Sequence, residues 1–392
     1  MKREITIESV LEDKVMLRAV NQISGKSNHG GFNGMYPREL REYWARHGTF
    51  IKNQIRTCSY YPDPVERHFI VKPGSHKKRE IGIYTVVDQA ILTALNMVLL
   101  PVFDAKLSKN SFAFRPNKNC LMALQRAIDV MNGGCDYVIK TDIHKCFDTI
   151  RLDILMDILR REIKDARLLC LLERYLRVDL YWDLKIREKR RGVVQGSSLS
   201  PLLANLYLHE LDTRLERKGI LFVRYADDIM IFARDRKKVA WAFGQAKEIL
   251  QSVLKMTFSQ DKTEWCMRTE VTFLGYSIKR FKRHYELYVS DKAIEKMHRK
   301  SNSIEKMPLE EVIEWMGSYN RGWINYYQYA NEDQLRLLAE QIDVKQSVYL
   351  ERLLNGLTDR ERSFLLGYQY HFVTMTEWKR KVSTSRKTRK RW

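Results

Sequence analysis

Proline is nearly absent from the second half of this 392-residue chain, and acidic residues are scarcer than basic ones over the whole chain. Seven of the eight prolines lie at or before Pro201, and only Pro308 follows. Because proline interrupts helices, this distribution predicts a mixed, turn-rich first half and a mainly helical last third. The 69 lysines and arginines outnumber 48 acids, which gives a net charge of +21. This surplus indicates a polyanionic partner such as nucleic acid, with a basic but non-binding surface as the alternative.

Paired cysteines and long apolar runs are also missing. The six cysteines are scattered, with no CxxC pair and no Cys/His cluster at zinc spacing, which predicts reduced, buried cytosolic thiols. The N-terminus is charged throughout and has no apolar stretch of the kind found in signal peptides. The longest apolar run, residues 90–103, contains Asn96 and Pro101 and is too short to cross a bilayer. We therefore expect a cytoplasmic protein that makes no membrane contact.

Two adjacent acids, Asp227 and Asp228, stand between apolar runs at residues 221–223 and 229–233. The β-branched and aromatic residues on both sides predict two strands, and the polar centre predicts the turn of a hairpin. Two carboxylates at one hairpin tip repel each other unless a cation neutralises them, and oxygen ligands suit Mg²⁺. A solvated turn is the alternative for an isolated pair of acids. The choice therefore depends on a third acid and on a surface that binds nucleic acid.

A third acid follows the buried strand predicted at residues 137–140. Asp142 comes just past this strand, at a position where acids commonly face a cleft, and Asp148 follows in the same segment. Asp142 either joins Asp227 and Asp228 in one carboxylate set or caps a helix. Two Mg²⁺ held by such a set would activate an attacking 3′-oxygen and stabilise a leaving pyrophosphate.

Basic residues collect on a second predicted hairpin, with strands at residues 66–71 and 80–84 around a turn at residues 73–76. The cations at this hairpin are Lys72, Lys77, Lys78 and Arg79. Such a hairpin either closes over a triphosphate, whose oxygens Arg and Lys neutralise, or is a solvated basic turn. Arg115 lies at another turn, just before the helix predicted at residues 120–131.

A polar loop of glycines and serines leads into a helix that Pro201 opens and Gly219 ends. A polar loop at a helix N-terminus is suited to nucleotide contacts, although any loop-to-helix junction looks similar. The remaining segments are predicted as helices over residues 152–176 and 239–256, a loop carrying Lys262, and one strand over residues 271–278 with Gly275 at its centre.

The last third combines aromatic and basic residues. Residues 316–330 predict a helix rich in tyrosine and tryptophan, which either forms core on one face or stacks along a nucleic-acid strand. Residues 378–392 hold eight lysines and arginines and no acid, so we expect this tail to bind phosphates.

In their order along the chain, these motifs resemble those of reverse transcriptases, most closely the bacterial group II intron-like branch. The resemblance covers roughly residues 15–330. The matching segments are REIGIYTVVDQ at 79–89, SFAFRP at 111–116, TDIHKCFD around Asp142, GVVQGSSLSPLLANLYL at 192–208, YADD at 225–228, DKTEW with FLGYSI after it, and GSYNRGWINYY at 317–327.

This resemblance implies an α+β, right-hand polymerase fold. Fingers would span residues 1–130, a palm with an antiparallel sheet 131–284, a helical thumb 285–345, and a C-terminal helical extension with a basic tail 346–392.

The resemblance also implies roles for single residues. Asp142, Asp227 and Asp228 would hold two Mg²⁺, and Lys262 would assist pyrophosphate departure. Phe147 would be the steric gate that rejects a 2′-hydroxyl, and Gln195 would contact the incoming nucleotide. Arg79 would bind the triphosphate, together with Lys72 and Arg115. The residues expected to contact primer and template are Tyr225, Phe273, Leu274, Gly275, Arg321, Trp323 and Tyr327.

The implied function is RNA-directed DNA polymerisation from dNTPs, with an RNA template and a DNA primer or product as partners, and protein partners or an oligomer possible. The chain departs from the family pattern at Gln89, where an arginine is usual, and at Ala113, where a glycine is usual. No endonuclease signature follows residue 345, so we expect a stand-alone enzyme with an antiphage-defence or other domesticated role. The alternatives are an intron-encoded maturase and a non-catalytic RNA-binding scaffold.

Overall fold

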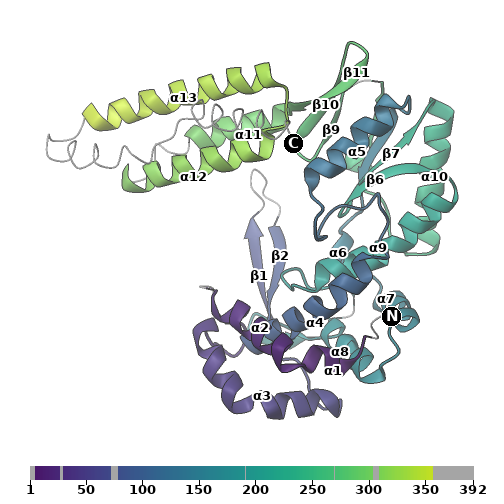
Figure 1. The fold of residues 1–392 in the computed structure, drawn as a ribbon, viewed down its shortest axis with the longest axis vertical. Coiled ribbons are helices and arrows are strands. Elements are labelled where there is room, and N and C mark those ends of the chain that lie inside the picture. Colours follow the sequence, from purple (N-terminus) through teal and green to yellow (C-terminus); the bar gives the residue numbers. More distant parts are fainter. Residues whose placement is uncertain are drawn as a thin grey trace, which may run out of the picture. The chain divides into compact units, whose positions relative to one another are not determined.

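The computed structural model describes residues 5–26, 30–71, 78–189, 191–268, 270–302 and 309–355 (Figure 1). Two compact units divide the chain. The first comprises Met1–Ala127 and Cys135–Trp265, and the second comprises Ile128–Gly134 and Cys266–Trp392. Lys72, Lys77, the predicted turn at residues 73–76 and the basic tail lie outside the described residues. All six cysteines are described; none forms a disulfide, and three of them are only partly buried.

Helices form the N-terminal part of the first unit. They are α1 (Ile7–Leu11), α2 (Asp13–Ser24), the 3-10 turn η1 (Pro37–Glu39) and α3 (Leu40–Arg56). Each helix buries one face, such as Met16, Ala19 and Ile23 of α2, which is the pattern of helices laid on a core.

One helix of this unit is apolar around most of its circumference. α4 (Val86–Asp104) packs against α2 and α1 and includes the apolar run at residues 90–103. Among the described residues it alone has the length and composition to cross a membrane, although the core helix of a soluble protein passes the same test. The apolar run at residues 90–103 predicted that this segment is too short to cross a bilayer. The helix itself has 19 residues, so its length does not exclude a membrane span. Its burial within this unit gives it the place of a core helix.

A four-stranded sheet lies at the centre of the first unit, in the order β6-β7-β3-β8. Its strands are β3 (Tyr137–Asp142), β6 (Leu221–Tyr225), β7 (Asp228–Ala233) and β8 (Glu264–Met267). β7 pairs antiparallel with both β6 and β3. Helices α9 (Ser200–Arg217) and α10 (Arg236–Ser252) pack against this sheet. The hairpin and the buried strand predicted from the apolar runs are therefore confirmed.

The basic hairpin belongs to a second sheet, in the order β2-β1-β4-β5. β1 (Val65–Val71) and β2 (Lys78–Ile83) are antiparallel, which confirms the two strands predicted there. β4 (Leu180–Trp182) joins β1 in parallel, and β5 (Lys185–Arg187) completes a hairpin that the sequence did not predict. The strands of this hairpin are only three residues long, too short for alternation to reveal them.

The other helices of the chain's middle part are α5 (Cys120–Asn132), α6 (Cys146–Thr149), α7 (Leu152–Glu162) and α8 (Ala166–Leu176). The single helix predicted over residues 152–176 is thus two helices. Asp165 makes the break, because its carboxylate accepts hydrogen bonds from the backbone N–H groups of Arg167 and Leu168 and caps α8.

In its described residues after Cys266, the second unit contains a three-stranded antiparallel sheet and three helices. They are β9 (Val271–Phe273), β10 (Tyr276–Phe281), β11 (His284–Val289), α11 (Asp291–Asn302), α12 (Leu309–Tyr327) and α13 (Glu332–Asn355). The single strand predicted over residues 271–278 is wrong. Leu274 and Gly275 have φ angles of +50° and +77° and turn the chain back in a two-residue hairpin. The region predicted as helical from residue 285 likewise begins as β11.

Candidate active site

The turn between β6 and β7 presents the adjacent acids. Tyr225 and Asp228 are the last paired residues of the two strands, so Ala226 and Asp227 form the tip. Ala226 has a φ of +58°, in the left-handed region that closes such tight turns. Asp227 and Asp228 are both partly buried, which raises the free energy of holding two negative charges at this tip.

The end of β3 brings the third acid to the same place. Asp142 lies directly opposite Asp228 in the antiparallel pairing of β3 and β7. Side chains opposite each other on one face of such a pair are close neighbours. The backbone N–H of Ile143 also donates to the carbonyl of Asp227 over 3.1 Å, which fixes the turn against the end of β3. The structure therefore places the three predicted acids at the same end of the sheet.

Lys262 supplies a positive charge in direct contact with Asp142. Its Nζ forms an ion pair with Oδ2 of Asp142, and this hydrogen bond raises the pKa of the lysine. Burial raises the pKa of Asp228 to about 6, and the charges of Asp227 and Asp142 act in the same direction. Burial also raises the pKa of Asp227, whereas the charges of Lys262 and Arg79 oppose that rise. The acids thus form an electrostatically frustrated cluster that a cation would stabilise.

The chemistry of this cluster fits a hard cation. Within the described residues, no three His, Cys, Asp or Glu side chains stand close enough together to make a ready metal site. Mutual repulsion keeps like carboxylates apart, and Lys262 already holds one oxygen of Asp142. The other oxygen of Asp142, Oδ1, is buried and lacks a hydrogen-bond partner among the residues described. Three carboxylates with such an unsatisfied oxygen are the donors that Mg²⁺ prefers.

The loop before α9 lies against the segment that carries Phe147. The N–H of Val193 donates to the carbonyl of Phe147 over 2.8 Å, and the Gln195 side chain donates to Asp148 over 3.2 Å. The carbonyl of Gln195 accepts a 2.7 Å hydrogen bond from the N–H of Gly82 on β2. The predicted gate, the predicted nucleotide contact and the basic hairpin are therefore neighbours. Phe147 itself is half-buried, with part of its ring accessible.

The three predicted phosphate ligands have different environments. Arg79 is exposed on β2, and its charge reaches Asp227. Lys72 lies outside the described residues. Arg115 is engaged inside the chain: it pairs with Asp104 over 2.6 Å and donates to the carbonyls of Ser108 and Ser111. With its side chain only 6% exposed, Arg115 braces the turn around residues 104–115, and its contact with a triphosphate stays a prediction.

One buried residue beside the turn was not predicted. Arg224 donates to both oxygens of Asp212, to Asn205 and to the carbonyl of Ala226. An arginine inside an apolar strand signals a buried partner, and that signal was present in the sequence. The sequence did not identify the partner, because Asp212 lies within a helix and reaches Arg224 only in the folded chain.

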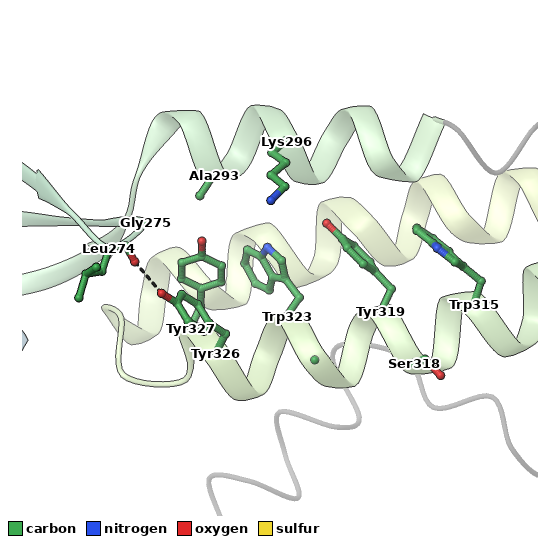
Figure 2. Close-up of a pocket in the computed structure, with 11 residues that line it drawn as sticks. Leu274, Gly275, Ala293, Lys296, Trp315, Ser318, Tyr319, Trp323, Tyr326 and Tyr327 are labelled. Carbon is green, nitrogen blue, oxygen red and sulfur yellow. Dashed lines mark hydrogen bonds between the residues drawn. The ribbon is translucent and has the colours of Figure 1, made fainter. Parts of the chain in front are cut away.

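The predicted primer and template contacts other than Tyr225 belong to the second unit. The hydroxyl of Tyr326 donates to the carbonyl of Leu274 over 2.8 Å, as Figure 2 shows. A Cβ on Gly275 would lie 2.8 Å from the Tyr327 hydroxyl, so glycine lets this turn pack against α12. Trp323 and Tyr327 are over nine-tenths buried, whereas Arg321 is exposed.

Aromatic residues of α12 line a hollow of about 710 Å³ in this unit. Trp315, Tyr319 and Trp323 project into it from α12, and Lys296 projects into it from α11 (Figure 2). Trp315 and Tyr319 are stacked, with ring centroids 4.7 Å apart. The aromatic helix therefore serves partly as core and partly as the wall of an accessible groove, and stacking of its aromatic residues along a nucleic-acid strand stays a prediction.

Comparison with known proteins places the chain in a family. Residues 70–278 match the family model described as reverse transcriptase (RNA-dependent DNA polymerase). The group II intron-encoded protein LtrA of Lactococcus lactis subsp. cremoris is 28% identical over 329 residues, which cover 67% of this chain and 54% of that protein. Protein YkfC of Escherichia coli (strain K12) is 25% identical over 304 residues, which cover 67% of this chain and 79% of that protein.

A third relative is the putative COX1/OXI3 intron 2 protein of Saccharomyces cerevisiae, 33% identical over 170 residues, or 43% of this chain and 20% of that protein. The chain thus spans about half the length of LtrA and less of the yeast protein. The similarity to LtrA and YkfC extends well beyond the carboxylate turn.

Proposed function

Because the chain belongs to the reverse transcriptase family, and its group II intron-like branch, we propose that it is an RNA-directed DNA polymerase that uses dNTPs. The observation that carries the proposal is the pairing of Asp142 with Asp228 across two strands, beside a turn that presents Asp227. In this reaction, the 3′-oxygen of the primer attacks the α-phosphorus of the nucleotide and pyrophosphate leaves.

The carboxylates would hold the metal ions in this reaction. Asp142 is well placed for this, since its Oδ1 is buried without a partner among the described residues, and Asp227 and Asp228 would be the other donors. When bound, two Mg²⁺ would activate the 3′-oxygen and neutralise the charge of the departing pyrophosphate. Lys262 would lose its ion pair with Asp142 to the metal and turn toward the leaving group, where its proton assists departure.

The nucleotide would lie between the basic hairpin and the loop before α9. Arg79 would neutralise triphosphate oxygens, and Gln195, held by Gly82 and Asp148, would contact the nucleotide. Phe147 would stand below the sugar and exclude a 2′-hydroxyl. These roles are supported by the hydrogen bonds that join the loop, the Phe147 segment and β2.

The biological role has two candidates. LtrA is named an intron-encoded protein and the yeast relative an intron protein, which supports a role in intron splicing or mobility. A stand-alone role in antiphage defence or another domesticated process is the other candidate. A splicing assay distinguishes them, in which purified protein is added to the transcript that contains its own coding region and the flanking sequence. A maturase accelerates splicing of an intron that contains its own coding region.

Primer extension tests the proposed chemistry. Purified full-length protein with primed poly(rA), Mg²⁺ and labelled dTTP should incorporate label, and chelation of Mg²⁺ should stop incorporation. Asp227→Ala should abolish incorporation while RNA binding persists. Equal incorporation by wild type and Asp227→Ala would overturn the proposal. Activity absent from both, with RNA still bound, would favour a non-catalytic RNA-binding scaffold.

A further inference from the structure

One face of the sheet β2-β1-β4-β5 carries alternating aromatic rings and guanidinium groups. The guanidinium of Arg67 lies 4.7 Å from the ring centroid of Phe69 and 5.1 Å from that of Trp182. Arg187 lies 4.9 Å from the same Trp182 ring. The rings of Phe69 and Trp182 are 6.1 Å apart and nearly perpendicular. We call these four residues the Arg–aromatic stack.

The strand pairing places all four on the same face. Side chains alternate along a strand, so Arg67 and Phe69 of β1 share a face. Val65 lies opposite Leu180, which puts Trp182 of β4 on that face as well, and Leu180 in turn lies opposite Arg187 of β5. The neighbouring Tyr181 points to the other face, where it contacts the ring of Phe32 at 4.8 Å. Phe32 therefore covers this opposite face at Tyr181, whereas Ile70 farther along the same face is 54% exposed.

The face with the stack is accessible. Phe69 is 42% exposed, and Trp182 is half-buried. Apolar rings are costly to leave in water, and cation–π contacts at exposed sites are weak. Arg187, which is exposed, can therefore leave Trp182 for another partner at little cost. The rings then become available for stacking.

The charge around the stack is one-sided. Lys78 and Lys185 are opposite Val71 and Trp182 in the pairing, so they share the face, and both are exposed. The acid that the pairing places on this face, Glu80, is already bound in an ion pair with Arg67. A partner must therefore present flat, unsaturated rings together with negative charge. Single-stranded nucleic acid has both, since its bases stack on aromatic and guanidinium planes and its phosphates pair with lysine and arginine.

We propose that the Arg–aromatic stack is a binding site for single-stranded nucleic acid, in which a base stacks on Trp182 and Arg187 moves from that ring to a phosphate. This inference deepens the proposed function, because it assigns a surface outside the carboxylate cluster to the class of polymer that the enzyme would copy. It requires no catalysis. The stack selects for unpaired bases, since a duplex keeps its base faces covered.

Binding to base-bearing and abasic oligomers of equal length tests this inference. Full-length protein at physiological salt is titrated with a fluorescent oligoadenylate, as RNA and as DNA, and with an abasic chain that has the same phosphates. Trp182→Ala should weaken oligoadenylate binding by at least about fivefold, because loss of one stacked base typically costs that much or more. Binding of the abasic chain should not change. Comparison of the RNA and DNA arms shows which polymer the site prefers.

Three controls make the outcome decisive. Trp241→Ala removes a tryptophan that is 54% exposed on α10 and should leave binding unchanged. Trp182→Phe should retain most of the affinity, which excludes misfolding as the cause of the loss. Asp227→Ala should bind oligoadenylate like wild type, so failure of polymerisation and failure of this site are distinguished.

Crosslinking gives an independent measurement. RNA containing 5-bromouridine should crosslink to the peptide that holds Trp182 when irradiated with wild-type protein. Equal affinity of Trp182→Ala and wild type for oligoadenylate, or an equal loss for the abasic chain, would overturn the proposal. A peptide or protein partner would then be the remaining class of ligand for this face.

Discussion

Arg224 and Asp212 form a fully buried ion pair, with both side chains 0% exposed and guanidinium–carboxylate distances of 2.8 and 2.6 Å. Arg224 uses a third contact, 2.9 Å long, to hold the carbonyl of Ala226 in the carboxylate turn. The pair therefore joins α9, which follows the nucleotide-contact loop, to the turn that presents Asp227. Its position suggests that it sets the orientation of the catalytic acids as well as stabilising the sheet.

Variants of this pair should affect stability and activity differently. Arg224→Met leaves Asp212 buried and unpaired, which should lower the free energy of unfolding by about 3–5 kcal/mol. Arg224→Met/Asp212→Leu removes both charges and should recover much of that loss, yet remain inactive because nothing holds the Ala226 carbonyl. Urea unfolding and primer extension measure the two effects. Arg46→Ala, in the exposed pair with Glu42, should change either quantity little. Activity restored in the double variant would contradict the positioning role.

The sequence predicted the parts of this site that depend on neighbouring residues in the chain. It did not predict the parts that depend on contacts between separate elements. The carboxylate hairpin and the strand before Asp142 depend on local alternation, and both were predicted. The partner of Arg224 depends on tertiary packing, and so does that of Arg115. Both partners, Asp212 and Asp104, lie 11 or 12 residues away on helices, and no local pattern marks which face they use.

The turn at Gly275 shows a second limit. The pattern of residues 271–278 predicts one strand, because a two-residue hairpin interrupts alternation for only two positions. Leu274 adopts a positive φ that leucine rarely adopts, and the packing of Tyr326 and Tyr327 against this turn stabilises it. This packing comes from α12, about fifty residues later, and cannot be deduced from the run itself.

Replacement of Lys262 should slow chemistry more than it weakens nucleotide binding. A positioned acid contributes roughly 10²–10⁴-fold in rate, so Lys262→Met should lower kcat at least about tenfold with a smaller change in KM for dNTP. The lysine is 59% exposed, so stability should change little. Steady-state primer extension measures both constants. Lys106→Met, which breaks the surface pair with Glu162, is the matched control. A change confined to KM would assign Lys262 to ground-state binding.

Phe147→Ala should relax the choice of sugar. With the ring removed, a 2′-hydroxyl has room, and the ratio of kcat/KM for ribonucleotides to that for dNTPs should rise at least about tenfold. Competition between labelled UTP and dTTP on primed poly(rA) measures the ratio. Phe50→Ala, at a 64% exposed ring on α3, should leave it unchanged. An unaltered ratio in Phe147→Ala would remove the gate assignment.

Asp88 should make stability depend on pH. It is fully buried and accepts hydrogen bonds from the hydroxyls of Thr85, Tyr60 and Tyr175 over 2.7–2.8 Å. Burial raises its pKa from 3.8 to about 6, against the effect of those hydrogen bonds. Between these values the folded chain binds a proton that the unfolded chain has released, so stability falls as pH rises from 4 to 6. The expected change is about 3 kcal/mol.

The variant Asp88→Asn isolates this effect, because its side chain does not titrate. Relative to Asp88→Asn, wild type should lose unfolding free energy as the pH rises from 4 to 6. Above pH 6 the difference between the two proteins should stay constant. Urea unfolding at a series of pH values measures the difference. A difference that is independent of pH would show that the carboxyl group keeps its ordinary pKa in the folded chain.

Gly196→Ala should disturb the nucleotide loop by forcing a side chain where none fits. Gly196 has a φ of +117°, and a Cβ there would lie 2.5 Å from the carbonyl oxygen of Gly82. The adjacent Gln195 depends on its hydrogen bond to that same residue, so the loop should move away from β2 and KM for dNTP should rise several-fold. Gly244→Ala is the matched control. It lies on α10 with nothing within 4 Å of its added Cβ, and should stabilise the helix by about 0.5–1 kcal/mol without affecting KM. Unchanged nucleotide kinetics in Gly196→Ala would mean that this loop does not contact the nucleotide.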